Sequence, residues 1–203
     1  MASKVVPLET LESDGNGATD GRRQRSADSR RRIIRALMEL VQDGELEPSA
    51  EAVAERADVG LRSVFRHFKD MEGLRQEMSG IVEGRLRAVI DQPLPGASWR
   101  EKLFALIDRR ADVFEQVMPY RRAGNAQRHR SPLIQEQSVR LNDILRTVVA
   151  GALPVGVSPV TLEAVDFAMC LDSWIRLRND QHLTATEARD VVIRIVEALV
   201  AGV

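Results

Sequence analysis

Apolar residues recur every three or four positions along almost the whole chain from Ser29 onward, which is the period of an α-helix. No stretch shows the strict alternation of apolar and polar residues that a half-buried strand requires. Short segments rich in Gly, Pro and Asp interrupt the helical pattern. The sequence therefore predicts an all-α protein of about nine helices. The clearest of them cover residues 29–42, 49–57, 61–68, 71–90, 99–118, 133–150, 160–178 and 184–200.

The first three of these helices form a group of their own. Ile33, Leu37 and Val41 give the first helix an apolar face, and Ser49 stands where the second helix would take its N-cap. Residues 58–60 make a tight turn into the third helix. Two short helices joined in this way behind a longer one form a helix-turn-helix, whose second helix is slim enough to enter the major groove of DNA. An ordinary three-helix core fits the same pattern equally well.

Charge is distributed unevenly along the chain. The formal net charge is −1 and the pI is about 6.3, so the protein as a whole has no basic character. Seven arginines nevertheless lie between residues 22 and 35 against a single acid, Asp28. Such a run is either a solvated arm or an electrostatic footprint for phosphate. Residues 1–27 contain Gly15 and Gly17 and lack sustained periodicity, and we interpret them as a disordered N-terminal arm.

Residues 49–74 resemble the sequence signature of the TetR family of helix-turn-helix transcription regulators. The resemblance implies a DNA-binding domain over residues 28–72, followed over residues 73–203 by an antiparallel helical bundle that binds a ligand and dimerises. It also shifts our interpretation of the arginine run towards contact with DNA. The positions that match the signature are Val53, Ala54, Ala57, Val59, Ser63, Val64, His67, Phe68, Glu72 and Leu74.

Several positions depart from the family pattern. Asp58 replaces the glycine of the turn, and Asp tolerates a left-handed backbone better than most residues. Gly60 replaces the serine that normally caps the third helix, at a cost of roughly a few tenths of a kcal/mol. Phe65 replaces a tyrosine whose hydroxyl the family uses on phosphate. Met71 replaces a lysine that contacts phosphate, and Lys69 is a nearby substitute for it.

Arg62 and Arg66 lie four residues apart and therefore share one face of the third helix. Arginine is the residue that most often reads guanine, through paired hydrogen bonds to O6 and N7. The alternative for both is a solvated arginine that pairs with nearby acids. His67 is either a phosphate donor, as the resemblance implies, or a satisfied core histidine. The DNA-binding residues we expect are Arg30, Arg31, Ser49, Leu61, Arg62, Ser63, Phe65, Arg66, His67 and Lys69.

The last two long helices, over residues 160–178 and 184–200, are apolar around more than one face. A helix that is apolar on two sides must be buried on two sides. Packing both helices against their counterparts in a second copy, as the resemblance implies, meets this requirement. We expect Val192 and Val196 at that homodimer interface. A single thick core within one chain is the alternative.

The resemblance also implies a cavity for a small-molecule effector among the long C-terminal helices. Residues 120–130 carry four arginines, which either favour an acidic ligand or belong to a solvated loop. The candidate ligand-binding residues, each of which also fits a plain core, are Phe104, Ile107, Phe114, Met118, Tyr120, Met169 and Trp174.

The sequence offers little that would support catalysis. Cys170 is the only cysteine, the three histidines are scattered, and neither a Gly-rich phosphate loop nor metal-ligand spacing occurs. We therefore expect no enzyme activity, no metal and no cofactor. The longest apolar runs are too short to span a membrane and the N-terminus lacks a signal pattern, which favours a cytoplasmic protein.

Together these features predict a DNA-binding transcription regulator. By family default it is a repressor that binds a palindromic operator as a homodimer and leaves it when a small molecule binds. The expected partners are double-stranded DNA, a second copy and an effector, with no membrane. The alternative is a helical ligand-binding or adaptor protein whose DNA binding is weakened or lost, because of Phe65 and Met71.

Overall fold

The computed structural model describes residues 18–127 and 131–203, and every regular element within them is a helix. The all-α prediction is therefore confirmed for this part of the chain. None of these helices is both long enough and apolar enough to cross a lipid bilayer. The elements are α1 (Ala18–Gln42), α2 (Ala50–Arg56), α3 (Leu61–His67), α4 (Met71–Ile90), α5 (Trp99–Gln127), α6 (Pro132–Ala152), α7 (Pro159–Ala168), α8 (Leu171–Ile175), the π-helix η1 (Arg176–Asp180) and α9 (Ala185–Leu199).

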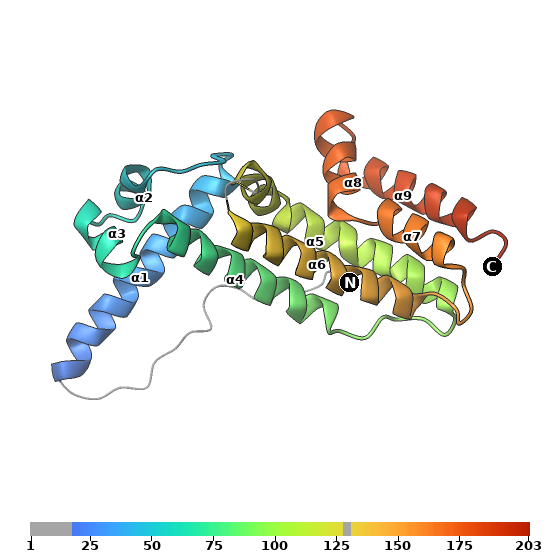
Figure 1. Ribbon diagram of the computed structural model, residues 1–203, viewed down its shortest axis with the longest axis horizontal. Coiled ribbons are helices and arrows are strands. Elements are labelled where there is room, and N and C mark those ends of the chain that lie inside the picture. Colours follow the sequence, from blue (N-terminus) through green and yellow to red (C-terminus); the bar gives the residue numbers. More distant parts are fainter. Residues whose placement is uncertain (1–17, 128–130) are drawn as a thin grey trace.

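The helices form an elongated molecule with two hydrophobic cores (Figure 1). Helices α1 to α3 lie at one end, α5 runs antiparallel to α4 and α6 along the length, and α7 to α9 cover the other end. Helix α4 belongs to both cores, because Leu74 and Met78 pack in the N-terminal core and Leu86 in the C-terminal one. Helix α5 also reaches the N-terminal core, through Tyr120 and Ala123. The two predicted domains therefore share α4 and α5.

Local signals set the boundaries of the N-terminal helices. The chain turns away from α1 at Gly44, whose φ of +103° suits glycine and few other residues. As predicted, the Ser49 hydroxyl caps α2 by accepting a hydrogen bond from the backbone N of Ala52 at 3.1 Å. Asp70 caps α4 in the same way, with Oδ1 accepting from the backbone N of Gly73 at 2.8 Å. These caps fix the starts of α2 and α4, and α3 lies between them.

Helix α1 begins well before Ser29, so residues 18–27 are helical and the disorder we predicted for them is wrong. The rest of the predicted arm, residues 1–17, lies outside the described residues. Two local contacts lie in and next to the extension: a hydrogen bond from Arg25 Nε to the Gly21 carbonyl at 3.0 Å, and an ion pair between Asp28 and Arg31 just after it. Such pairs support a helix without the apolar periodicity on which the prediction relied.

Helix α5 continues through Pro119 to Gln127, although the sequence predicts that it ends at Met118. A proline inside a helix costs about 3 kcal/mol. The continuation buries Tyr120 in the N-terminal core, and it brings Arg121 within 3.0 Å of Asp172, which offset that cost. The solvated loop we considered for residues 120–127 is therefore wrong, and residues 128–130 lie outside the described part of the chain.

The long helix predicted over residues 160–178 is instead three elements, α7, α8 and η1. The break lies at Cys170, whose backbone is extended and whose Sγ accepts from the backbone N of Ser173 at 3.3 Å. The Met169 carbonyl, which would receive that N–H in a continuous helix, instead accepts a hydrogen bond from Arg110 Nη1 at 2.7 Å. The arginine that satisfies this carbonyl is 59 residues away, so local periodicity gives no sign of the break.

Candidate nucleic-acid interface and internal cavity

The turn between α2 and α3 sets the orientation of α3. Asp58 has a φ of +51°, which is the left-handed conformation that its place in the turn predicts. The backbone N of Val59 then donates to the Ala54 carbonyl at 3.0 Å and folds the turn onto α2. Gly60 is the N-cap of α3 and supplies no side-chain hydrogen bond, as expected for a glycine in the place of a serine. Helix α3 is therefore held mainly by its packing.

Helix α3 has one buried and one exposed face. Val64 and the adjoining Phe68 are only 1% and 5% exposed and pack into the N-terminal core. Ser63, between the two faces, is half-buried. The helix projects at the end of the molecule (Figure 1), where a flat or grooved partner can reach it. Its exposed face carries Leu61, Arg62, Phe65 and Arg66.

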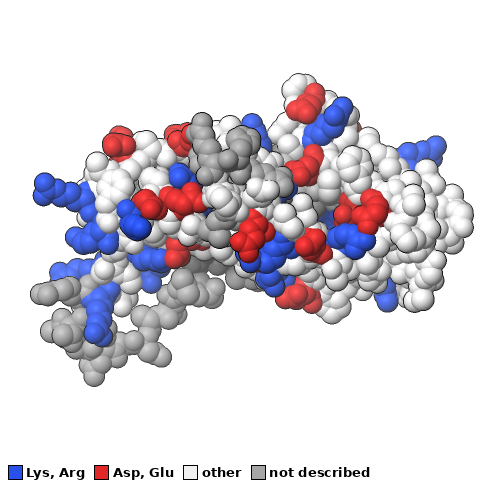
Figure 2. Space-filling model, in the orientation of Figure 1, with Lys and Arg blue, Asp and Glu red and all other residues white. Residues whose placement is uncertain are grey.

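The cations on and just after α3 have no acidic partner within residues 18–127 and 131–203. Arg62, Arg66 and Lys69 are exposed, and none of them forms an ion pair or side-chain hydrogen bond there. Figure 2 shows Lys and Arg side chains gathered at the end of the molecule that α1, α2 and α3 form. Cations that are not already paired bind phosphate without first losing a partner, so this end is the electrostatic candidate for nucleic acid.

The arginines predicted on α1 are placed differently. Arg30 Nη2 lies 2.5 Å from Glu77 Oε1 of α4, and its guanidinium stacks 4.9 Å from the centre of the Phe68 ring. Arg31 forms an ion pair with Asp28. Both side chains thus stabilise the N-terminal domain itself, and the DNA contacts we expect for them require these pairs to open.

Two further predicted residues lie at helix ends. Ser49 is exposed, and its hydroxyl proton remains free to donate although its oxygen accepts the capping bond of α2. His67 is half-buried, and its Nε2 is covered and without a hydrogen-bond partner among the described residues. Burial, followed by the charges of Arg66 and Arg30, lowers the pKa of His67 below 6.5, so the ring is neutral at pH 7. His67 is therefore not a satisfied core histidine within the described residues, and its contact with phosphate stays a prediction.

The candidate ligand residues fall into three places. Phe104 and Met118 pack half-buried against the C-terminal core, whereas Tyr120 lies in the N-terminal core. The other four residues line an internal cavity of about 10 Å³, which is room for a single water molecule. They are Ile107, Phe114, Met169 and Trp174.

Arg110 also lines this cavity, although it is not among the ligand residues that we expected. The signal was present, because Arg110 interrupts the apolar stripe of α5 that runs through Leu103, Leu106, Phe114 and Val117. A charged residue on the buried face of a helix is uncommon unless it is paired or has a specific role. A charged residue that interrupts an apolar stripe in this way therefore indicates a candidate site.

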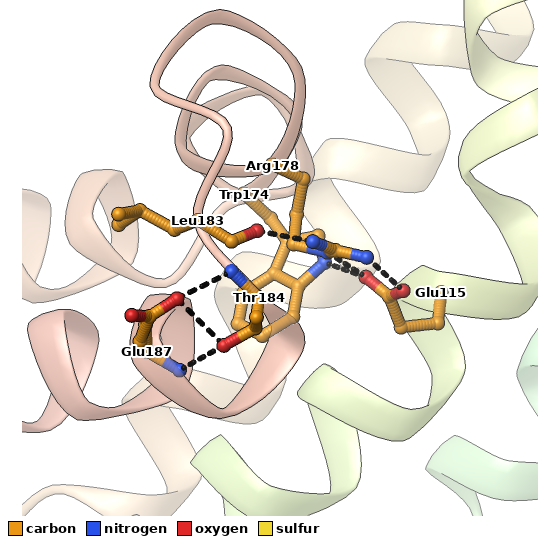
Figure 3. A network of polar contacts seen from close by, with 6 residues as sticks. All are labelled: Glu115, Trp174, Arg178, Leu183, Thr184 and Glu187. Carbon is orange, nitrogen blue, oxygen red and sulfur yellow. Dashed lines mark hydrogen bonds and ion pairs between the residues drawn. The ribbon is translucent and has the colours of Figure 1, made fainter.

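A polar network fixes one wall of the cavity (Figure 3). Glu115 of α5 accepts hydrogen bonds from Trp174 Nε1 at 2.8 Å and from Arg178 Nε and Nη2 at 2.7 and 2.9 Å. Arg178 also donates to the Leu183 carbonyl. The hydrogen bond from Arg178 holds the pKa of Glu115 below its usual value, so the carboxylate stays charged. The indole of Trp174 is therefore held in place by η1 and α5 together.

Solved structures share this arrangement of helices. A TetR-family transcriptional regulator from Streptomyces coelicolor matches with a TM-score of 0.65 and 17% identity, over 86% of this chain and 81% of that one. A candidate transcriptional regulator from Streptomyces coelicolor A3(2) matches with a TM-score of 0.60 and 22% identity, over 83% and 98%. A TetR-family regulator from Haemophilus influenzae matches with a TM-score of 0.56 and 17% identity, over 86% and 98%. No protein-family model and no curated protein matches the sequence.

The molecule is thus a helix-turn-helix unit built onto an all-helical second unit, with α4 and α5 shared between them. This is the fold of the TetR-family transcriptional regulators. The resemblance that residues 49–74 indicate is confirmed at the level of the fold.

Proposed function

We propose that this protein is a DNA-binding transcriptional regulator that places α3 in the major groove. The observation that carries the proposal is the outer face of α3, where Arg62 and Arg66 lie one turn apart. Both are exposed and lack an acidic partner in the described part of the chain. Behind them, Val64 and Phe68 anchor the helix in the core. A slim, firmly held helix with free arginines suits contact with base edges.

The proposed contacts follow from position along the helix. Recognition helices usually touch base edges with their N-terminal residues, so we assign guanine reading to Arg62. Arg66, one turn later, contacts a base or a phosphate. Lys69, Ser49 and Ser63 provide phosphate contacts that set the register of the protein on the duplex.

We further propose that two copies associate through α7 and α9, which lie side by side (Figure 1). Val160 and Phe167 of α7 are 78% and 72% exposed, and Ile195 of α9 is 43% exposed. Val192 and Val196, which we expected at this interface, are 4% and 0% exposed and lie in the core of their own chain, so that expectation is wrong. Their side of α9 packs against α5, which leaves the Ile195 side for a second copy.

The regulation we propose is repression relieved by a small effector in the C-terminal core. Helix α4 is the mechanical link, because it has residues in both cores. It is also tied to α6, since the Ser131 hydroxyl donates to Glu72 Oε1 at 2.6 Å. A ligand that shifts α4 changes the separation of the two α3 helices in a dimer. Such coupling typically amounts to about 1–3 kcal/mol.

Selection of binding sequences from a pool of random duplexes tests the proposal. We expect a palindromic sequence to be enriched, and its affinity to fall steeply between about 50 and 200 mM salt. Replacing Arg62 and Arg66 together by Ala should abolish the enrichment. Arg176→Ala is the matched control, because this exposed arginine lies in η1, far from α3. A pool without enrichment, or an equal loss in the control, contradicts the proposal.

A helical ligand-binding protein without DNA binding is the second candidate. Met71, in the place of a phosphate-contacting lysine, packs against the N-terminal core, and Phe65 has no hydroxyl to offer. In this case the selection enriches no sequence, whereas a ligand still binds the C-terminal core.

A further inference from the structure

We propose that the internal cavity binds a small organic acid with an apolar body, and that Arg110 of α5 receives its carboxylate. An effector role for this acid rests on the function proposed above, whereas binding of the acid in the cavity does not depend on that function. The cavity lies between α5, α7, α8 and α9, within the C-terminal core.

The hydrogen bonds of Arg110 leave one side of its guanidinium open. The side chain is buried, with the residue only 5% exposed. Nη1 donates to the Met169 carbonyl at 2.7 Å and Nη2 donates to the Leu145 carbonyl at 2.6 Å. Nε is buried and has no hydrogen-bond partner among the described residues. A guanidinium has five N–H donors in a fixed plane, which suits a carboxylate that binds through two oxygens.

Among the residues that the structure describes, no anion is in contact with the positive charge of Arg110. Burial lowers its pKa to about 10, so the side chain remains protonated at neutral pH. Asp166 and Cys170 lie near enough to influence it, but within the described residues neither forms an ion pair or hydrogen bond with it. Burial raises the pKa of Asp166, and the nearby charge of Arg110 acts in the opposite direction. A buried cation without a contacting anion is costly, and a ligand carboxylate would supply that partner.

The rest of the cavity wall indicates what the acid carries. Ile107, Phe114, Met169 and Trp174 present apolar surface, and the rings of Phe114 and Trp174 meet edge to face with centroids 6.3 Å apart. One cation among apolar and aromatic groups fits a monocarboxylate with an aliphatic or aromatic body. A sugar phosphate or a dicarboxylate would leave polar groups without partners in this wall.

Binding must enlarge the cavity, because its present volume of about 10 Å³ holds only one water molecule. Met169 is the flexible part of the wall, and it lies at the break between α7 and α8. A carboxylate that draws Arg110 away from the Met169 carbonyl removes the hydrogen bond that stabilises this break. The acid would therefore move the end of α7, the helix that carries the exposed Phe167.

Matched pairs of acids and amides test the inference on the full-length wild-type protein. The probes are phenylacetate with phenylacetamide and hexanoate with hexanamide, measured by isothermal titration calorimetry and thermal shift without DNA. The members of each pair have nearly the same shape, so the pair isolates the charge. We expect at least one acid to bind ten or more times as tightly as its amide and to raise the melting temperature. If neither acid binds, or if acids and amides bind equally, the inference is wrong.

Two variants connect the preference to the residue. Arg110→Met should remove the preference for acid over amide, and Arg110→Lys should retain part of it. Arg109→Met is the matched control, because Arg109 also donates to backbone carbonyls, those of Gln92 and Pro93, but does not line the cavity. Acid preference that persists in Arg110→Met places the binding elsewhere and overturns the inference. If Arg110→Met does not fold, the ratio of acid affinity to amide affinity in the wild type and in Arg110→Lys still tests the inference.

The outcome is separable from that of the proposed function. If the protein binds the acid but enriches no duplex, the ligand site is supported and the proposed regulatory role is wrong. If the protein enriches a duplex but does not prefer the acids over the amides, the regulatory role is supported and the proposed ligand site is wrong.

Discussion

Arg62 and Lys69 carry the same charge but offer different hydrogen-bond geometry. The planar fork of arginine holds the O6 and N7 of one guanine together, whereas lysine is a mobile point charge that suits phosphate. Both side chains are exposed, and they lie on α3 and two residues after its end. They are therefore a natural pair for separating sequence reading from general affinity.

Arg62→Ala should cost about 1–3 kcal/mol on the selected duplex and relax the preference at one position in each half-site. Lys69→Ala should instead weaken all sequences nearly equally and lower the salt slope by about 1. Competition titrations with selected and random duplexes measure both effects. A uniform loss of affinity with Arg62→Ala would reassign that residue to phosphate.

Phe65 is 47% exposed on α3, where the resemblance implies a tyrosine hydroxyl on phosphate. Phe65→Tyr should tighten binding to all duplexes by about 1 kcal/mol, or roughly fivefold, because it restores one hydrogen bond. Anisotropy titrations check the affinity, and thermal unfolding should show unchanged stability. Unaltered affinity would mean that this edge of α3 does not face the DNA backbone.

At the scale of single residues, the sequence predicts local features well. The Ser49 cap and the left-handed Asp58 depend only on neighbouring positions, and both are present. The pairing of Arg30 with Glu77 was not predicted, because the partners are 47 residues apart. Arg110 was missed although it interrupts the apolar stripe of α5, and its carbonyl partners, Leu145 and Met169, lie on other parts of the chain.

Helix α3 has an N-cap residue, Gly60, that supplies no side-chain hydrogen bond. Gly60 has the extended backbone of an N-cap, with φ −68° and ψ 145°, and a Cβ there would meet nothing within 4 Å. Gly60→Ser should therefore stabilise the protein by roughly a few tenths of a kcal/mol. Gly44→Ser is the contrasting control, since at φ +103° a side chain is strained and should cost about 1 kcal/mol. Urea unfolding midpoints should shift in opposite directions, and a loss of stability in both variants would contradict the capping argument.

The bounds of a helix follow from the sequence where apolar periodicity and a local cap agree. Helix α4 has the predicted bounds, because apolar periodicity and the Asp70 cap agree. Helix α5 passes through Pro119, and the helix predicted over residues 160–178 breaks at Cys170, because tertiary contacts outweigh the local signals there. Neither contact is visible in a stretch of sequence read by itself.

For the whole molecule, the exposed apolar surface of α7 and α9 is the feature that a single chain leaves unexplained. Phe167→Glu should shift the protein from dimer to monomer and weaken operator binding at the same time, because a charge in a buried interface is costly. Val139→Glu is the matched control, since Val139 is 49% exposed on α6. Sedimentation at micromolar concentration measures the assembly. A monomeric wild type, or equal dissociation of both variants, would place the interface elsewhere.

The all-helical fold and the helix-turn-helix could be predicted, because apolar residues recur with helical spacing along most of the chain and the signature is contained in residues 49–74. The side of α9 that remains exposed could not be predicted from the sequence. Both faces of this helix are apolar, and only the packing of the folded chain decides which face α5 covers.

The placement of α3 in the major groove is tested most directly by protection of guanine N7 from methylation on the selected duplex. N7 lies in the major groove, so protection reports a side chain placed there. We predict two symmetric groups of protected guanines, about 10 base pairs or somewhat more apart, and loss of one protected guanine in each group with Arg62→Ala. Bound DNA whose guanines remain fully reactive, or protection that Arg62→Ala leaves intact, would contradict the placement of α3 in the major groove.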